Sequence, residues 1–318
     1  MPPRLASCQL RLLVMAANPT TFVYINRVSG SGHGEELWLE HEHLIHLRYP
    51  EVSVLEDMTE LHGAVHSLGK DDPLRLIVIG GDGTIHLVLN AILSHKGLSY
   101  AKDHLEVLLI SSGTGCDYYK TLQEKKMVTP RAVDVGSVTF SDGRAKYFVN
   151  SCSLGLGGHA LSLQRPWHKK YLPSLLSYML PGIQAFLKAP VYRFSISQTG
   201  GNTPAGAPAP LVGDFWGLMI YCGRYAGGGM LWAPLSDLSD GLLDFLKIRH
   251  FSRGQLVSAL ASLLSGAIHK NPNVAYDHVS EVDVRCESTF PIEMDGELYH
   301  DKHVVVRVVP QAFRVGMF

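Results

Sequence analysis

The sequence predicts a two-part chain, an α/β domain with a doubly wound sheet followed by an all-β domain built as a β-sandwich. Short β-rich runs alternate with helix-like stretches up to about residue 133, whereas separate β-rich runs dominate beyond it. The chain has 318 residues, which is more than one hydrophobic core usually organises. We therefore expect one domain over residues 1–133 and a second over residues 134–318.

The first domain alternates strands and helices. Its strands are short runs of β-branched and other apolar residues, such as TFVYIN and LRLIVI, and glycine-rich turns follow them. The expected strands cover 21–26, 52–55, 74–79 and 105–110, and the expected helices cover 35–47, 58–68 and 85–93. Because helices separate these strands, we expect a largely parallel sheet with helices on both faces.

The second domain is predicted to consist mostly of strands. Its expected strands cover 146–153, 192–198, 215–222, 242–248, 282–285 and 304–309, and its expected helices cover 173–187 and 252–268. The segment 199–210, TGGNTPAGAPAP, is typical of a long exposed hairpin loop. Strands that follow one another in this way favour a sandwich or barrel-like domain.

Composition excludes several classes of protein. Hydrophobic residues make up 46% of the chain and charged residues 18%, which is the balance of a globular protein. The formal net charge of −1 gives no field that would draw the chain to nucleic acid. The five cysteines are scattered and show no CxxC spacing, which favours reduced thiols in a cytoplasmic protein. The sequence has no apolar run of about 20 residues, so any membrane contact is expected to be local and peripheral. Arg11 interrupts the apolar stretch 5–17, so no signal peptide is expected there.

Three glycine-rich turns follow predicted strands, at 29–34, 80–84 and 112–115. The carboxyl ends of strands in an open α/β sheet line one crevice, so these turns can converge on one ligand. Glycine lets backbone N–H groups approach phosphate oxygens closely. Any single turn is also explained by a tight loop that needs glycine, but three in register favour a nucleotide triphosphate site. The pattern is neither a P-loop nor a Rossmann GxGxxG pair.

Asp82 lies inside the second of these turns. Bound phosphates repel a carboxylate unless a divalent cation lies between them. The position therefore indicates Mg²⁺, which phosphoryl transfer also needs to neutralise charge on the transferring group.

The sequence resembles the diacylglycerol kinase and sphingosine kinase family, whose GGDGT signature matches residues 80–84. The NAD kinases share that signature, but the later motifs separate the two groups. Four further segments are similar to lipid kinase motifs: 112–117 (SGTGCD, family PxGTGND), 148–155 (FVNSCSLG, family FxNxxSxGxxA), 238–244 (LSDGLLD, family LxDGxLD) and 294–297 (MDGE, family xDGE). These matches occur in family order and cover nearly the whole chain.

The resemblance implies an ATP-dependent lipid kinase that uses Mg²⁺, with ATP bound by the first domain and the lipid cleft completed by the second. The residues implied for ATP binding are Asn26, Ser29, Gly30, Gly32, Gly80, Gly81, Asp82, Gly83, Thr84 and Thr114. Glu297 is implied as the general base, a role that Asp82 could share. The acceptor would be diacylglycerol or a related lipid at a membrane surface, and a homodimer is left open.

Two acidic segments have alternative explanations. The segment 237–242 resembles the family's structural Mg²⁺ loop, in which the Asp240 carboxylate joins main-chain carbonyls of Asp237 and Leu242, but an ordinary Asp-Gly turn explains it equally well. The Asp295-Gly296 pair is a strong hairpin signal that would leave Glu297 solvated. The other motifs nevertheless favour the catalytic interpretation of Glu297.

The sequence departs from the family pattern at four positions. Arg27 replaces a proline with a cation that could reach a phosphate, and Leu87 replaces a carboxylate. Cys116 stands where asparagine is usual, and Leu235 where aspartate is common. These departures support the alternative of a catalytically degenerate nucleotide- or lipid-binding protein. An NAD kinase-like enzyme is the other alternative, although the Asn-Glu element expected after its GGDGT helix is lacking.

A basic and aromatic stretch, WHKKY at 167–171, precedes an apolar run over 172–187. These residues can form a membrane-docking edge. Packing of the same apolar run into a core is the more common outcome.

Overall fold

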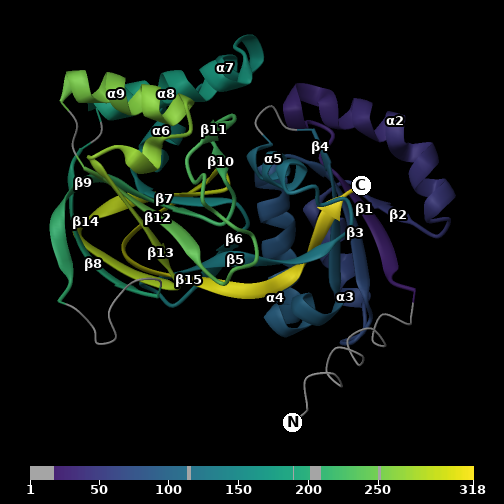
Figure 1. Ribbon diagram of the computed structural model, residues 1–318. Coiled ribbons are helices and arrows are strands. Elements are labelled where there is room, and N and C mark those ends of the chain that lie inside the picture. Colours follow the sequence, from purple (N-terminus) through teal and green to yellow (C-terminus); the bar gives the residue numbers. More distant parts are fainter. Residues whose placement is uncertain (1–17, 113–115, 189, 201–208, 250–251) are drawn as a thin grey trace.

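The computed structural model describes residues 18–112, 116–188, 190–200, 209–249 and 252–318 (Figure 1). The stretch 5–17, most of the predicted hairpin loop and Thr114 lie outside these described residues. The described chain forms an N-terminal lobe, residues 18–130 with the end of the last strand, and a C-terminal lobe, which contains the rest. No described helix is both long enough and apolar enough to cross a bilayer.

The N-terminal lobe is a parallel sheet with helices on both faces, as predicted. Its strands, in the spatial order β2-β1-β3-β4, are β1 (Thr20–Ile25), β2 (Ser53–Leu55), β3 (Leu74–Gly80) and β4 (Leu105–Ser111). Its helices are the short 3-10 helix η2 (Ser29–Gly32), α2 (His33–Arg48), α3 (Met58–Ser67), α4 (Asp82–His104) and α5 (Asp117–Glu124).

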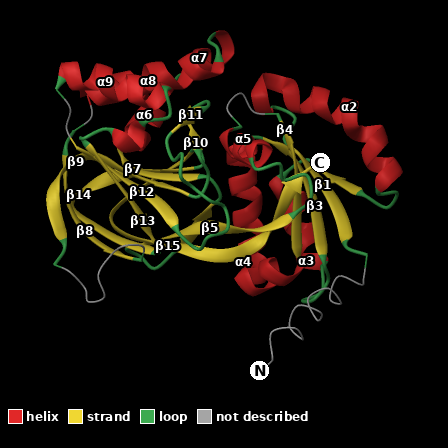
Figure 2. Ribbon diagram, viewed as in Figure 1, coloured by secondary structure: helices red, strands yellow, loops and turns green. Residues whose placement is uncertain are grey.

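The alternation of side chains along β1 explains the two helical layers. Val23 and Ile25 pack with Trp38 and Ile45 of α2 in one core. Tyr24 points to the opposite face and belongs to the core that α3 and α4 cover. Both faces of the sheet are therefore buried, which accounts for the continuous apolar runs in its strands (Figure 2).

The C-terminal lobe is a curved, mainly antiparallel β structure capped by helices. Its strands are β5 (Arg131–Phe140), β6 (Ala145–Phe148), β7 (Ser151–Gly155), β8 (Tyr192–Thr199), β9 (Leu211–Tyr221), β10 (Tyr225–Ala226), β11 (Met230–Leu231), β12 (Leu243–Arg249), β13 (Val274–Val279), β14 (Glu281–Met294) and β15 (Glu297–Met317). Its helices are α6 (Leu156–Leu163), α7 (Pro166–Tyr171), α8 (Ser174–Lys188), α9 (Arg253–Leu264) and the 3-10 helix η3 (Ile268–Lys270). Phe186 and Leu263 anchor α8 and α9 on Trp216 and Leu246 of the sheet.

Strand β15 joins the two lobes. Its first part pairs with β14 and β5, and its last residues, Arg314–Met317, pair in parallel with β4. The C-terminus thus completes the sheet of the N-terminal lobe (Figure 1). The lobes share one hydrogen-bonded sheet, and the division at residue 133 stays a prediction.

Several element predictions were wrong in detail. The strand expected over 146–153 is split, because backbone N–H groups of Val149 and Asn150 donate to the Asp295 carboxylate instead of to a neighbouring strand. Helix α4 begins at Asp82 rather than at residue 85, since Gly81 already accepts the first helical hydrogen bonds. Strands β5, β10, β11 and β13, helices α5, α6 and α7, and the 3-10 helix η2 were not predicted, and the helix expected over 252–268 ends at Leu264, before η3.

Candidate active site

A cavity of about 660 Å³ lies between the two lobes. The N-terminal lobe lines it with Asn26, Val28, Ser29, Gly30, Gly81, Asp82, Gly83, Thr84, Leu87, Cys116 and Asp117. The C-terminal lobe contributes apolar side chains, the carboxylates of Glu293, Asp295 and Glu297, and polar groups at Asn150 and Ser151. The volume is typical of a site for one substantial ligand or two adjoining ones.

The glycine turns after β1 and β3 meet at one end of this cavity, beside Ser112 at the end of β4. The Asn26 amide donates a hydrogen bond to Thr84 Oγ1 at 2.9 Å, and the Ser112 N–H donates to the Gly80 carbonyl at 3.2 Å. Gly30 has φ +60°, and a Cβ on it would lie 1.8 Å from the Ser112 carbonyl oxygen. Only glycine fits so close an approach, so the first two turns meet beside Ser112, while the convergence of all three turns on one ligand stays a prediction.

Helix α4 starts at this end of the cavity. Asp82, Gly83 and Thr84 form its first turn, where the helix dipole favours an anion. The Thr84 N–H already donates to the Gly81 carbonyl at 2.9 Å, so Asp82 and Gly83 carry the N–H groups that precede the helical hydrogen bonds. The Asp82 carboxylate accepts hydrogen bonds from the N–H groups of Asp117, at 2.9 Å, and Tyr118, at 3.3 Å. It therefore caps α5 and connects the second glycine turn to the start of that helix.

Burial raises the pKa of Asp82 well above that of an ordinary aspartate, and the nearby carboxylates of Asp117 and Asp295 raise it further. Burial also raises the pKa of Asp117. A carboxylate in such surroundings gains most from a positively charged ligand.

The predicted ATP-binding residues divide into three groups. Those that line the cavity are Asn26, Ser29, Gly30, Gly81, Asp82, Gly83 and Thr84. Gly32 and Gly80 are not part of the lining, and Thr114 is outside the described residues. The Arg27 guanidinium forms ion pairs with Glu35 and Glu56 instead of lining the cavity.

The departures at Leu87 and Cys116 fall on the cavity itself. Leu87 lines it as a largely exposed apolar side chain. Cys116 has φ +33° and precedes α5 in the left-handed conformation. Asparagine adopts that conformation more readily than most residues, which gives a physical reason for the family's preference.

The hairpin between β14 and β15 carries both predicted features. Asp295 (φ +48°) and Gly296 (φ +96°) have the two positive φ angles of a type I′ turn, so this is the strong hairpin that Asp-Gly indicates. Glu297, just after the turn, lines the cavity, and its Oε1 would lie 3.7 Å from a Cβ on Gly83. The fold thus brings Glu297 to the start of α4.

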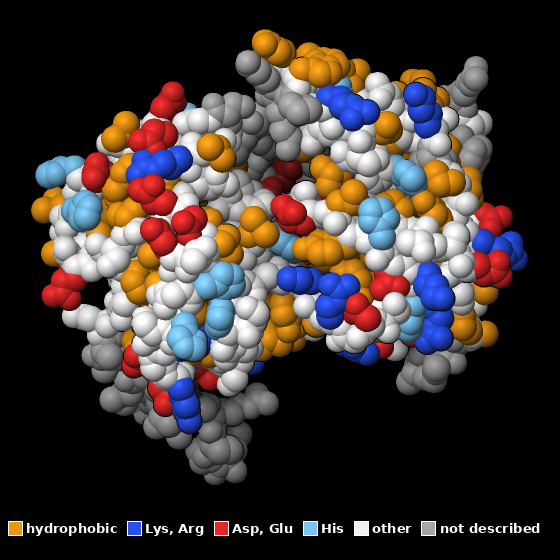
Figure 3. Space-filling model, turned by 180° about the vertical axis from the view of Figure 1, so that it is seen from behind, with side chains coloured by type: hydrophobic (Ala, Val, Ile, Leu, Met, Phe, Trp, Pro, Cys, Tyr) orange, Lys and Arg blue, Asp and Glu red, His pale blue; other side chains and the backbone are white. Residues whose placement is uncertain are grey.

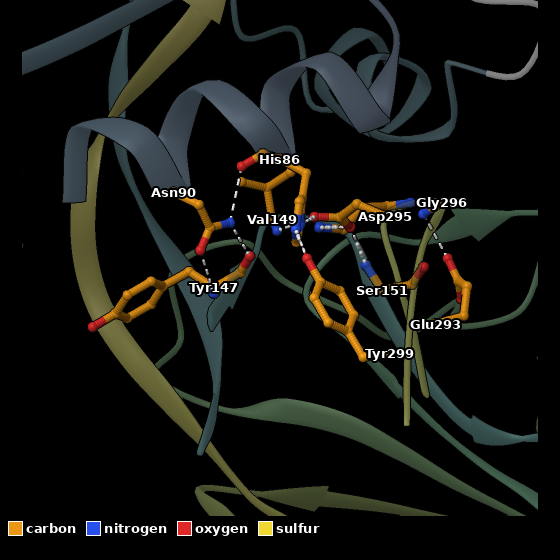
Figure 4. A network of polar contacts seen from close by, with 10 residues as sticks. His86, Asn90, Tyr147, Val149, Ser151, Glu293, Asp295, Gly296 and Tyr299 are labelled. Carbon is orange, nitrogen blue, oxygen red and sulfur yellow. Dashed lines mark hydrogen bonds and ion pairs between the residues drawn. The ribbon is translucent and has the colours of Figure 1, made fainter. Parts of the chain in front are cut away.

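Asp295 holds this hairpin in place. Its carboxylate accepts hydrogen bonds from the N–H groups of Val149, Asn150 and Ser151 at 2.8–3.0 Å (Figure 4). His86 of α4 lies 3.4 Å from the same carboxylate and contacts the Tyr299 hydroxyl at 3.1 Å. The network connects both lobes beside the cavity, so Asp295 positions the residues on either side of it.

Sequence reasoning missed two acidic residues of the cavity. Asp117 accepts a hydrogen bond from Gly228 N–H at 2.9 Å through Oδ2, while its buried Oδ1 has no hydrogen-bond partner among the described residues. It belongs to the SGTGCD motif, which could have identified it. Glu293 lies two residues before Asp295 and no motif marks it.

The cavity is strongly acidic. Five carboxylates line it, and none of the described lining residues is Lys, Arg or His: the acids are Asp82, Asp117, Glu293, Asp295 and Glu297. No group of three or more potential ligands among the described side chains is arranged as a complete metal site. Mg²⁺, however, usually takes one or two carboxylates together with substrate phosphates and water. The unpartnered Asp117 Oδ1 beside Asp82 fits that requirement.

The proposed structural metal loop lies away from the cavity. Asp237 forms an ion pair with Lys125 at 3.0 Å and accepts hydrogen bonds from Ser239. Asp240 accepts from the Leu242 N–H at 2.9 Å. These hydrogen bonds are those of Asx turns, and Lys125 neutralises one of the two carboxylates. The assignment of Asp237, Asp240 and Leu242 to Mg²⁺ stays a prediction.

The opposite end of the cavity is apolar. Its walls are Leu156, Ala160 and Leu161 of α6, Phe186 of α8, and Met219, Met230 and Trp232 of the sheet and the β10–β11 region. Helix α8 adds Tyr178, Pro181 and Gly182. This surface suits hydrocarbon rather than a second polar ligand.

A parallel α/β lobe whose glycine turns face a β lobe across an acidic cavity defines a two-lobed kinase. Residues 20–137 match the model described as the diacylglycerol kinase catalytic domain, and residues 155–317 match the YegS C-terminal NAD kinase beta sandwich-like domain. The chain therefore belongs to the YegS-like lipid kinases, which makes it a phosphotransferase.

Individual proteins that are similar to this chain carry names consistent with this family. A protein of Chromohalobacter salexigens named "Probable lipid kinase YegS-like" is 30% identical over 247 residues, which are 75% of this chain and 74% of the relative. One of Shewanella frigidimarina with the same name is 24% identical over 77% of this chain and 76% of its own length. A solved structure from Bacillus anthracis, titled "A putative diacylglycerol kinase", superposes with a TM-score of 0.70 at 16% identity over 94% of this chain and 97% of that chain, and so has the same fold.

Proposed function

We propose that the protein transfers the γ-phosphoryl group of ATP to a hydroxyl of an acylglycerol lipid, with diacylglycerol as the first acceptor to test. The observation that carries the proposal is the division of one cavity into a polar end at the glycine turns and an apolar end at α6 and α8. A phosphate donor suits the first end and a hydrocarbon chain the second. The apolar wall also favours a lipid over NAD as the acceptor.

The polar end would hold the nucleotide mainly through backbone groups. The N–H groups of Asp82 and Gly83 at the start of α4 would face phosphate oxygens, and the turn from Asn26 to Gly30 lines the cavity beside them. Mg²⁺, held by Asp82 and Asp117, would neutralise charge on the phosphates during transfer. Asp82 also orders α5 through its two backbone hydrogen bonds, so it shapes the same end of the cavity.

Glu297 would act as the general base. A lipid hydroxyl is a weak nucleophile, and a carboxylate within hydrogen-bond reach can take its proton as the phosphoryl group is transferred. Glu297 Oε1 lies beside Gly83, where the phosphate end of a nucleotide would approach. Asp295 is a positioning residue, because its hydrogen bonds to the backbone of 149–151 fix the hairpin that carries Glu297.

Helix α8 would connect the cavity with a membrane surface. One face lines the apolar end through Tyr178, Pro181 and Gly182. Leu175, Leu176 and Leu180, together with Trp167 and Tyr171 of α7, are exposed instead. Figure 3 shows hydrophobic side chains at the surface along the helical cap of the C-terminal lobe. Contact of this edge with a bilayer would let a lipid reach the cavity without crossing water.

A phosphoryl-transfer assay tests the proposal. The purified protein is incubated with labelled ATP, Mg²⁺ and vesicles that contain diacylglycerol, monoacylglycerol or phosphatidylglycerol, and NAD serves as the non-lipid acceptor. We expect label in a lipid product identified by mass spectrometry. Label in NAD, or ATP binding without transfer to any acceptor, would contradict the proposal.

A further inference from the structure

Among the described residues, one hydrogen bond holds the Glu293 carboxyl group. Its Oε1 accepts a hydrogen bond from the Gly296 N–H at 2.7 Å, which places it directly against the hairpin turn before Glu297. Its Oε2 is on the side of Gly157 of α6 and would lie 3.7 Å from a Cβ there. Gly157 and Glu293 both line the cavity. Because glycine has no side chain, the α6 wall leaves this oxygen accessible to a ligand.

Among the described residues, no positive charge is found to stabilise the ionised form of Glu293. The titratable groups whose charges interact with Glu293 are all acidic, and they are Asp117 of α5, Cys152 of β7, Tyr178 of α8, Tyr221 of β9 and Asp295 of the hairpin. Asp82 and Glu297 are the other carboxylates of the cavity, and its described lining includes no basic side chain. Burial, followed by the charges of Asp295 and Asp117, raises the pKa of Glu293 to about 8.

A carboxyl group in such an environment is more stable as the neutral acid, which keeps one acceptor oxygen and gains an O–H donor. The acceptor oxygen is already used by the Gly296 N–H. The donor is then directed toward the cavity, at the boundary between its acidic and its apolar parts. A half-buried donor of this kind needs an acceptor, which the apolar side chains of α6 and β9 do not supply. Ser153, opposite Glu293 on β7, already accepts a hydrogen bond from the Gly157 N–H at 3.0 Å.

We infer that Glu293, as a neutral acid, donates a hydrogen bond to the ester carbonyl of the lipid acceptor and so selects acylglycerols over lipids that lack a carbonyl near the reacting hydroxyl. The inference rests on the proposed function, because it names the acceptor group recognised in the same cavity. The location fits this role, since Glu293 is held by the turn that precedes Glu297. A group bound at Glu293 would therefore lie next to the hydroxyl that Glu297 deprotonates.

The test compares a diester acceptor with its matched diether, which has the same chains and hydroxyl but no carbonyl. At pH 7 the wild-type kcat/KM should be roughly 10-fold or more higher for the diester, because the diether leaves this donor unpaired. Glu293→Met should lose this preference. Glu293→Gln should keep it, since its amide also donates. Above about pH 8 the wild-type preference should decline as Glu293 ionises, whereas that of Glu293→Gln should not.

Four outcomes separate the explanations. Equal use of diester and diether by the wild type overturns the role of Glu293 and leaves the lipid kinase assignment intact. Phosphorylation of neither overturns the proposed function itself. Preference for an amine-bearing acceptor, abolished in Glu293→Gln, would show that the carboxylate binds a cation instead. A changed Mg²⁺ requirement in Glu293→Gln, with the ester preference unaltered, would assign the side chain to the metal.

Discussion

The two ends of the cavity are built in different ways. The proposed nucleotide end consists largely of backbone, with glycines that permit close approaches such as that of Gly30 to Ser112. The lipid end consists of side chains from α6, α8 and β9, which are far apart in the sequence. Backbone sites require particular residues at particular spacings, whereas an apolar wall accepts many residues of similar volume. The first end therefore has a recognisable sequence signature and the second has none.

The largest expected effect is at the backbone-built end. Asp82→Asn should reduce phosphoryl transfer by roughly 10⁴-fold, because it removes the carboxylate that we propose faces the metal and phosphates. One acceptor oxygen remains, so part of the contact with α5 should persist and the fold should survive. Turnover and circular dichroism measure the two effects. Asp103→Asn, an exposed position at the far end of the same helix, is the control, and normal turnover of Asp82→Asn would contradict the assignment.

Glu297 lies where the two ends meet. Glu297→Gln should lower kcat by roughly 10²- to 10⁴-fold with little change in ATP affinity, since it keeps size and polarity but removes the proton acceptor. Steady-state kinetics and nucleotide titration provide the measurement, and the exposed Glu287→Gln on β14 is the matched control. A loss of less than about threefold would move the base to Asp82.

A charge placed at the proposed lipid end should weaken lipid binding and leave ATP binding unchanged. Leu161→Asp places a charge on the apolar wall and should raise the KM for the lipid by roughly 10-fold or more, while ATP affinity stays the same. Ser162→Asp, the exposed neighbour on α6, should change neither quantity. If Leu161→Asp weakened ATP binding instead, the two ends would not be separate.

The smallest expected effect concerns stability. Glu293 has a folded-state pKa near 8, raised above its unfolded value, so the unfolded state binds fewer protons between about pH 5 and pH 8. Stability should therefore fall as pH rises through this range. Glu293→Gln removes that contribution, so its melting temperature should exceed that of the wild type by a few degrees at pH 8 and match it at pH 5. Equal melting temperatures at both pH values would show that Glu293 is already ionised in the folded protein.

The contrast between the backbone-built and the side-chain-built end of the cavity also explains how much could be predicted from the sequence. The parallel sheet, its helices and the cavity position of Asn26, Gly30 and Asp82 follow from local patterns of glycine and apolar residues. The function of Asp295 as an anchor for 149–151 does not, because it depends on how β14 lies beside β7. For the same reason Glu293 has no local signal, although it directly precedes the recognised motif 294–297.

The most direct test of the proposed division of the cavity is a structure of the protein with a non-hydrolysable ATP analogue, Mg²⁺ and a diacylglycerol. We predict that the γ-phosphate lies at the start of α4 beside Gly83, with Asp82 and Asp117 toward the metal ion. The lipid hydroxyl should lie within hydrogen-bond distance of Glu297, and an acyl chain should follow α6 and α8. A nucleotide bound away from the glycine turns, or a lipid outside the apolar end, would contradict the division of the cavity into these two parts.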